Sequence, residues 1–231
     1  MAEPPSTRAR LEGITDTIRV GLSAAHDARE TALPACRATI RSASRAIRAI
    51  HRGEAAAAGA HVAEAEASLR VAQRTLAPFP AVAHGGFLHD AEKELAEARL
   101  TAALVAGEPV PGPDELGVDP TAWMRGLCEA ASELRRNLLD RLREGDLARG
   151  EALLVAMDDV YDVLSLVDYP DALTHGLRRS LDQLRAVLER SRGDVTTTVL
   201  QTRLQRAIVA GDREGGGGAA GPDATAEPPQ P

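Results

Sequence analysis

Aromatic residues are almost absent from this chain, and their scarcity limits the folds open to it. Of its 231 residues, 44% are hydrophobic but only 2% are aromatic. The core must therefore be built from Ala, Leu, Val and Ile. Because Ala, Leu, Arg and Glu are also the strongest helix formers, the composition predicts an all-α protein with almost no β-structure. A chain of this length is sufficient for one domain with a substantial core.

Hydrophobic periodicity, together with Gly and Pro, divides the chain into seven predicted helices. The first is unusually long, residues 7–52, and Pro34 should kink or break it. Asp119 followed by Pro120 is a typical helix start, with a capping side chain and a proline in the first turn. The other six predicted helices cover residues 54–76, 87–106, 120–143, 147–166, 171–191 and 193–210.

Both ends of the chain lack this periodicity. Residues 1–6 are predicted to be a short flexible lead, and residues 211–231, rich in Gly and Pro, a disordered tail. Residues 7–210 are therefore expected to form one helical domain. No run approaches the ~18 apolar residues of a membrane span, and the N-terminus lacks an apolar signal segment. We expect a cytoplasmic protein that does not contact membranes.

Four glutamates form two pairs on the third and fourth predicted helices. At about 100° per residue, Glu94 and Glu97 lie about 60° apart, and Glu129 and Glu133 about 40° apart. If the two helices pack side by side, four carboxylates converge. Carboxylate oxygens hold Mg²⁺ or Mn²⁺, and such an ion activates water and stabilises charge on a phosphate. The alternative is an ordinary solvated acidic face, which the pattern alone favours.

Five arginines share one face of the first predicted helix, within about 80° of one another: Arg37, Arg41, Arg45, Arg48 and Arg52. We call them the arginine ridge; His51 lies beside it and is a further candidate for contact with phosphate. No acidic residue occurs from Ala32 to Gly53, although the net charge of the chain is −7. A phosphate backbone would suit this face. The alternative is pairing with acidic faces of neighbouring helices or of another subunit.

Aromatic residues do not alternate with these arginines, so binding by stacked bases is disfavoured. We expect a flexible single strand to be held by charge.

Four strings of the sequence resemble the translin superfamily, and they occur in the family's order. They are RAIRAIHRGE at 45–54, ELAEA at 94–98, GLCEAASELR at 126–135 and YPDALT at 169–174. The similarity runs over roughly residues 8–210 and is greatest to prokaryotic translin-like proteins and to translin-associated factor X. The resemblance implies a seven-helix protomer of a hollow, often octameric, homo-oligomer around single-stranded RNA or DNA.

In catalytic members of that family, Glu-x-x-Glu and Asp-x-x-x-Glu on adjacent helices coordinate Mg²⁺ for endoribonuclease chemistry. Glu94 and Glu97 match the first motif and Glu133 the second glutamate, whereas Glu129 stands where the family has aspartate. The extra methylene is expected to shift the metal ion or to weaken its binding. The resemblance thus implies a Mg²⁺- or Mn²⁺-dependent endoribonuclease in which these four glutamates are both ligands and catalytic groups. The arginine ridge would position phosphates without reading bases.

The main alternative is a non-catalytic oligomer that binds single-stranded nucleic acid, as in translin itself, which lacks the full acidic set. A helical nucleotide pyrophosphohydrolase is disfavoured because its second motif is Glu-x-x-Asp, whereas the pair here is Glu129-x-x-x-Glu133. A di-iron carboxylate bundle requires Glu-x-x-His motifs, and the sequence contains none.

Overall fold

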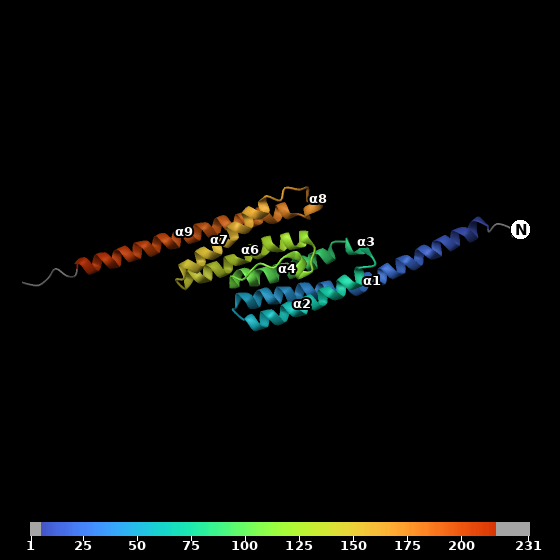
Figure 1. The fold of residues 1–231 in the computed structure, drawn as a ribbon, viewed down its shortest axis with the longest axis horizontal. Helices are drawn as coiled ribbons and strands as arrows, with labels where there is room; N and C mark the ends of the chain where they lie inside the picture. Colours follow the sequence, from blue (N-terminus) through green and yellow to red (C-terminus); the bar gives the residue numbers. More distant parts are fainter. Residues whose placement is uncertain (1–5, 216–231) are drawn as a thin grey trace, which may run out of the picture.

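The computed structural model describes residues 6–215, and every secondary-structure element in that range is an α-helix, as predicted (Figure 1). The long helices are α1 (Thr7–His51), α2 (Ala55–Leu76), α4 (Phe87–Ala106), α6 (Pro120–Arg143), α7 (Leu147–Ser165) and α9 (Leu177–Gly215). Three one-turn helices lie in the connections: α3 (Pro80–Ala83), α5 (Pro113–Leu116) and α8 (Asp171–Thr174). The predicted fold class, an all-α bundle, is confirmed.

The long helices form a bundle in which α4 and α6 are the central pair (Figure 1). α4 packs against α1 on one side and against α6 on the other, while α6 also contacts α7 and α9. The N-terminal part of α1 and the C-terminal part of α9 extend beyond the bundle at opposite ends (Figure 1). The two predicted acidic pairs are therefore carried by neighbouring helices at the centre of the molecule.

Small side chains allow these helices to approach closely, as the composition suggested. The buried hydrophobic positions along α1 and α4 are mostly alanines, and the largest fully buried side chains of the bundle are mostly leucines. Gly126 of α6 lies directly against the backbone of α4. A Cβ atom there would be 2.9 Å from the Lys93 carbonyl oxygen, the Glu97 amide nitrogen and the Ala96 Cβ.

α1 continues through Pro34, so the alternative of a break at this proline is wrong. A proline inside a helix removes one backbone hydrogen bond and costs about 3 kcal/mol. Ala32 and Cys36, on either side of Pro34, are both buried in the core. Packing on both sides of the proline therefore keeps the helix continuous.

The prediction of two separate helices over 171–191 and 193–210 is also wrong. The chain forms the one-turn α8, reverses at His175 and Gly176, and then continues as one helix through Gly193. A helical glycine costs only about 1 kcal/mol relative to alanine. Arg135 of α6 donates hydrogen bonds to Ser191 Oγ at 3.0 Å and to Asp194 Oδ2 at 2.8 Å, which holds both sides of the glycine.

The predicted domain ends differ slightly from the structure. Ser6, assigned to the flexible lead, caps α1 by accepting a hydrogen bond from the Ala9 amide at 3.3 Å. α9 runs to Gly215, so residues 211–215 are helical rather than part of the tail. Residues 1–5 and 216–231, with the rest of the predicted lead and tail, lie outside the described residues. None of the helices within 6–215 has an apolar stretch long enough to span a bilayer.

Candidate metal centre and nucleic-acid interface

The pairing of α4 with α6 brings three of the four predicted glutamates together. Glu94 and Glu97 of α4 and Glu129 of α6 each offer one carboxylate oxygen, and these three oxygens lie within 4.8 Å of one another. We call these residues the carboxylate cluster. Glu129 reaches the cluster although its side chain is one methylene longer than the aspartate that the resemblance implies at this position. The geometry is therefore that of a candidate site for a hard divalent cation.

Glu97 is the most buried member of the cluster, with 8% of its surface exposed. Burial, followed by the negative charges of Glu129 and Glu94, raises the pKa of Glu97 to about 8. No hydrogen bond to its carboxyl group occurs among the described residues. Burial and neighbouring negative charge both oppose ionisation of this carboxyl group, and a bound cation would stabilise its ionised form.

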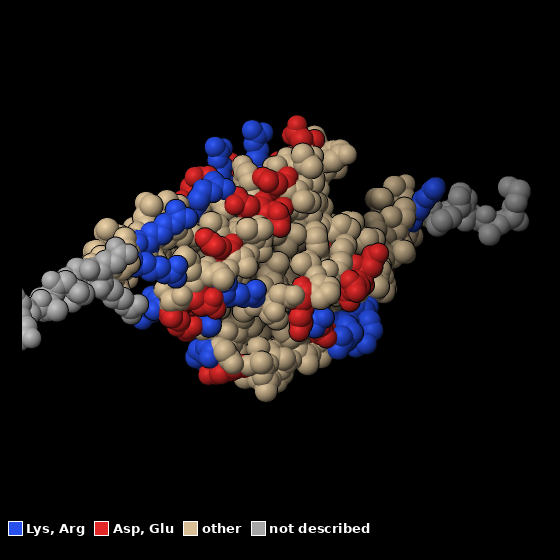
Figure 2. All heavy atoms as spheres, turned by 60° about the vertical axis from the view of Figure 1, so that its left-hand side comes forward, with Lys and Arg blue, Asp and Glu red and all other residues tan. Residues whose placement is uncertain are grey.

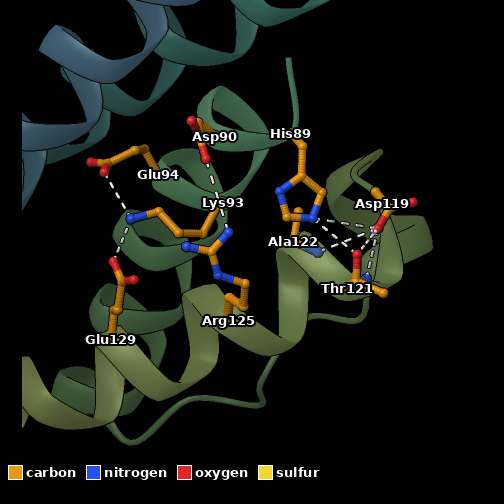
Figure 3. Close-up of polar contacts among 9 residues, drawn as sticks. All are labelled: His89, Asp90, Lys93, Glu94, Asp119, Thr121, Ala122, Arg125 and Glu129. Carbon is orange, nitrogen blue, oxygen red and sulfur yellow. Dashed lines mark hydrogen bonds and ion pairs between the residues drawn. The ribbon is translucent and has the colours of Figure 1, made fainter. Parts of the chain in front are cut away.

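Lys93, the only lysine of the chain, lies inside this acidic environment. Its ammonium donates hydrogen bonds to Glu94 Oε1 at 2.9 Å and to Glu129 Oε2, so it bridges the two helices (Figure 3). Burial opposes its charge, but the bonds to Glu129 and Glu94 outweigh burial and raise the pKa of Lys93. The lysine is therefore charged and partly neutralises the cluster, a role that helical spacing alone did not indicate.

Glu133, the fourth predicted glutamate, lies outside this group of three. Its Oε2 is 2.6 Å from Nε2 of His51, at the end of α1. Asn137 Nδ2 in turn donates to His51 Nδ1 at 3.2 Å. Since Nδ1 is then the acceptor, a neutral imidazole carries its proton on Nε2, and this N–H donates a hydrogen bond to Glu133. The charge of Glu133 still contributes to the raised pKa of Glu97.

His51 does not extend into solvent with the arginine ridge. Its side chain is 4% exposed and is held by Glu133 and Asn137 of α6. This position is better suited to orienting Glu133 than to contacting phosphate. The sequence could not distinguish these roles because it does not show that α6 crosses the end of α1.

All five members of the arginine ridge are exposed, four of them on α1 and Arg52 as its C-terminal capping residue. Within the described residues only Arg52 belongs to an ion pair, with Glu54 at 2.7 Å. The alternative in which neighbouring acidic faces neutralise the ridge therefore applies to one arginine of five. From Arg37 to Arg52 the helix rises about 22 Å, at about 1.5 Å per residue. Its C-terminal end adjoins His51, so the ridge leads towards Glu133.

Two adjoining hollows lie next to the His51–Glu133 pair, with volumes of about 510 and 470 Å³. The first is lined by His51, Arg52 and Asn137, and the second by Glu133 and Arg136. Both have Asp140 and Arg143 in their walls. Solvent-accessible space with basic side chains is therefore available beside the fourth glutamate.

The N-terminal ends of α4 and α6 are joined by further polar contacts (Figure 3). His89 Nε2 lies 2.9 Å from Thr121 Oγ1, and Asp119 caps α6 as predicted by accepting from the Thr121 amide at 2.7 Å. Arg125 lies one turn before Glu129 and pairs with Asp90 at 3.9 Å. Its Nε is buried and has no hydrogen-bond partner among the described residues. The side chain as a whole is 22% exposed, so the positive charge of Arg125 lies near the surface close to the cluster.

A second row of exposed arginines follows α9. Figure 2 shows basic side chains along the segment that leads to the C-terminal end, on a face where acidic side chains are also frequent. On a continuous helix the members Arg178, Arg185, Arg192 and Arg203 share a face about 40° wide. Arg192 pairs with Asp158 at 2.5 Å. This row is not apparent from the sequence when the helix is divided at Gly193, because its members then fall on two separate helices.

Comparison with known proteins identifies relatives of limited sequence similarity. No family model matches the chain. An uncharacterized protein of Methanocaldococcus jannaschii is 30% identical over 132 residues, which is 57% of this chain. The match spans only 58% of the length of that relative.

Solved structures resemble most of the chain. AfC3PO, whose structure is known by itself and in a complex with duplex RNA, is 29% identical with a TM-score of 0.75. That match covers 81% of this chain and 97% of AfC3PO. The apo structure of NeC3PO has a TM-score of 0.71 over 80% of this chain and 96% of its own. At 16% identity this second likeness shows the fold alone.

Proposed function

We propose that this chain is a member of the translin superfamily, as its similarity to AfC3PO suggests, and that it binds single-stranded RNA or DNA and cleaves RNA with the help of Mg²⁺ or Mn²⁺. The observation that carries the proposal is the convergence of Glu94, Glu97 and Glu129 on adjacent helices. The structure of AfC3PO with duplex RNA supports nucleic acid as the ligand.

The residues present fit a hard divalent cation. The three converging ligands are all carboxylate oxygens, the donor type that Mg²⁺ and Mn²⁺ prefer. Burial, and after it the negative charges of Glu129 and Glu94, raise the pKa of Glu97 to about 8, and a bound cation would offset those charges. When bound, the ion would supply positive charge to a scissile phosphate and lower the pKa of an attacking water.

The chain's own residues would orient the substrate and move a proton. His51 holds Glu133 through one carboxylate oxygen, beside the two hollows. The other oxygen has no hydrogen-bond partner among the described residues, so it is available to accept a proton from water. Whether Glu133 is also a fourth ligand stays a prediction.

The basic side chains would hold the nucleic-acid backbone. The arginine ridge is exposed over about 22 Å of helix and provides contacts to phosphates that do not depend on base identity. Arg125, one turn before Glu129 and partly exposed, supplies a further positive charge next to the carboxylate cluster. Since a guanidinium forms bidentate bonds to phosphate oxygens, Arg125 is suited to contact the phosphate nearest the cluster.

The second candidate is binding without cleavage, and Lys93 is the observation that favours it. Its ammonium already bonds two members of the carboxylate cluster. If that arrangement is permanent, the cluster is a structural ion-pair network. Binding would then be sensitive to salt, would persist in EDTA and would not be followed by cleavage.

The test is incubation of the purified protein with labelled single-stranded RNA, with Mg²⁺ or with EDTA. We expect Mg²⁺-dependent cleavage that Glu97→Gln lowers on the order of 100-fold or more, since even residues that only support metal ligands contribute 10–100-fold. RNA binding by this variant should persist. Glu151→Gln, an exposed site on α7, serves as the matched control and should cleave normally.

Cleavage that persists in EDTA, or in the Glu97→Gln variant at the control rate, would exclude the metal-dependent reaction.

The arginine ridge is tested separately by reversing charge with Arg41→Glu and Arg48→Glu. Loss of RNA binding and a shallower salt dependence are expected, whereas unchanged binding would exclude the ridge as the contact surface.

A further inference from the structure

We infer that Lys93 is a built-in competitor of the divalent cation, because its ammonium occupies the position between the α4 and α6 carboxylates that the cation requires. A divalent ion can then bind only when the lysine leaves. This inference rests on the metal centre of the proposed function.

The ligands of the two cations overlap. Lys93 donates to Glu94 of α4 and to Glu129 of α6, and these two residues supply two of the three oxygens of the carboxylate cluster. The close-up view shows the ammonium between the two carboxylates (Figure 3). An ion bound to the same groups would lie only a few ångströms from the ammonium, and the two positive charges would repel each other in this partly buried environment.

Packing fixes the backbone of Lys93, whereas its side chain can turn towards solvent. Its carbonyl oxygen lies at the closest approach of α4 to Gly126 of α6, so its backbone is fixed. Its side chain is 11% exposed, whereas those of Glu94 and Glu129 are 23% and 30% exposed. The four-carbon stem can therefore rotate towards solvent past the exposed edges of its two partners.

In the metal-free protein Lys93 also has a structural effect. It places a positive charge among carboxylates that would otherwise repel one another across the α4–α6 interface. Removing the charge should therefore lower the stability of the metal-free protein and raise the affinity of the carboxylate cluster for a divalent ion. A lysine that only filled space would produce neither effect.

The experiment measures Mn²⁺ affinity by calorimetry and thermal stability with and without Mn²⁺. The proteins are the wild type, Lys93→Met, and Lys93→Gln as a second variant that keeps a neutral polar group. Arg99→Met is the matched control, since it removes a positive charge from α4, and among the described residues Arg99 pairs only with Glu66, at 3.8 Å. None of these readouts requires cleavage.

We expect Lys93→Met and Lys93→Gln to bind Mn²⁺ about tenfold or more tightly than the wild type, through relief of charge repulsion. Without metal both should melt at a lower temperature than the wild type, and Mn²⁺ should raise their melting temperature more than it raises that of the wild type. Arg99→Met should match the wild type in Mn²⁺ affinity.

Equal or weaker Mn²⁺ binding by both Lys93 variants, alongside measurable binding by the wild type, would overturn competition and leave the proposed function intact. Binding by the variants but not by the wild type would support competition and overturn metal-dependent cleavage by the natural chain. Binding by none of the proteins at millimolar Mn²⁺ would overturn both.

Discussion

Gly126 marks a close contact between the two helices that carry the carboxylate cluster. A Cβ atom at this position would meet two backbone atoms of α4, the Lys93 carbonyl oxygen and the Glu97 amide nitrogen, each at 2.9 Å. Backbone atoms cannot rotate away as a side chain can, so the whole helix would have to move. The backbones of Lys93 and Glu97 are thus positioned by the absence of one side chain on α6.

We predict that Gly126→Ala lowers the free energy of unfolding by about 1–3 kcal/mol, the usual cost of overpacking, although alanine is the better helix former. It should also weaken Mn²⁺ binding, because α4 and α6 move apart. Denaturation in urea and calorimetry measure the two effects. In Gly59→Ala, where no atom lies within 4 Å of the new Cβ, stability should be unchanged or raised by up to about 1 kcal/mol. Similar effects of the two substitutions would contradict this explanation.

Helical spacing identified the four glutamates but not how many of them meet. Spacing gives the direction of a side chain around its own helix, whereas convergence also depends on distance from the point where two helices touch. Glu133 is seven residues from Gly126, about 10 Å along α6 at 1.5 Å per residue. At that distance its partner is His51 of α1. Lys93 and Asn137 were missed for the same reason, since their roles depend on neighbours from other helices.

At the scale of helices, the ends of α1 and α9 that extend beyond the bundle each carry an unpaired apolar stripe (Figure 1). Leu11, Ile14 and Ile18 recur at spacings of three and four residues, and Leu200, Leu204 and Ile208 at spacings of four. All six side chains are more than half exposed. Apolar stripes of this kind mark surfaces that another protein covers. We propose that other copies of this chain cover them in a homo-oligomer, for which the family resemblance implies an octamer.

The double variant Ile14→Glu with Ile18→Glu tests that proposal. Charges in a buried apolar interface are costly, so the mass measured by light scattering should fall while helical content is kept. Val20→Glu is the control, because Val20 is an exposed apolar residue on the opposite face of the same helix. An unchanged mass in the double variant would exclude this stripe as an assembly surface.

Helix limits were predictable where a local signal decides them and not where packing does. Asp119 with Pro120 marks the start of α6 correctly, since the Asp119 side chain satisfies free amide groups of the first turn. Pro34 and Gly193 were expected to interrupt helices, but α1 and α9 continue through them. Their local costs, about 3 and about 1 kcal/mol, are smaller than the tertiary packing on either side of them can supply.

At the scale of the whole molecule, basic and acidic groups lie in different places, and exposed basic surfaces occur although the net charge is −7. The arginine ridge on α1 and the arginine row on α9 are exposed, whereas the carboxylate cluster is partly buried between α4 and α6. His51 connects the end of the ridge to Glu133. Composition and periodicity predicted the all-α class and the ridge. They could not give the order of helices across the bundle, on which the link between ridge and cluster depends.

The most direct measurement is anomalous scattering from Mn²⁺ in crystals of the wild-type protein soaked at millimolar concentration. We predict a peak bounded by the carboxylates of Glu94, Glu97 and Glu129, with the Lys93 ammonium turned away from them. Crystals with Lys93 still bonded to Glu94 and Glu129, and with Mn²⁺ absent from the cluster or bound only elsewhere, would contradict the metal centre.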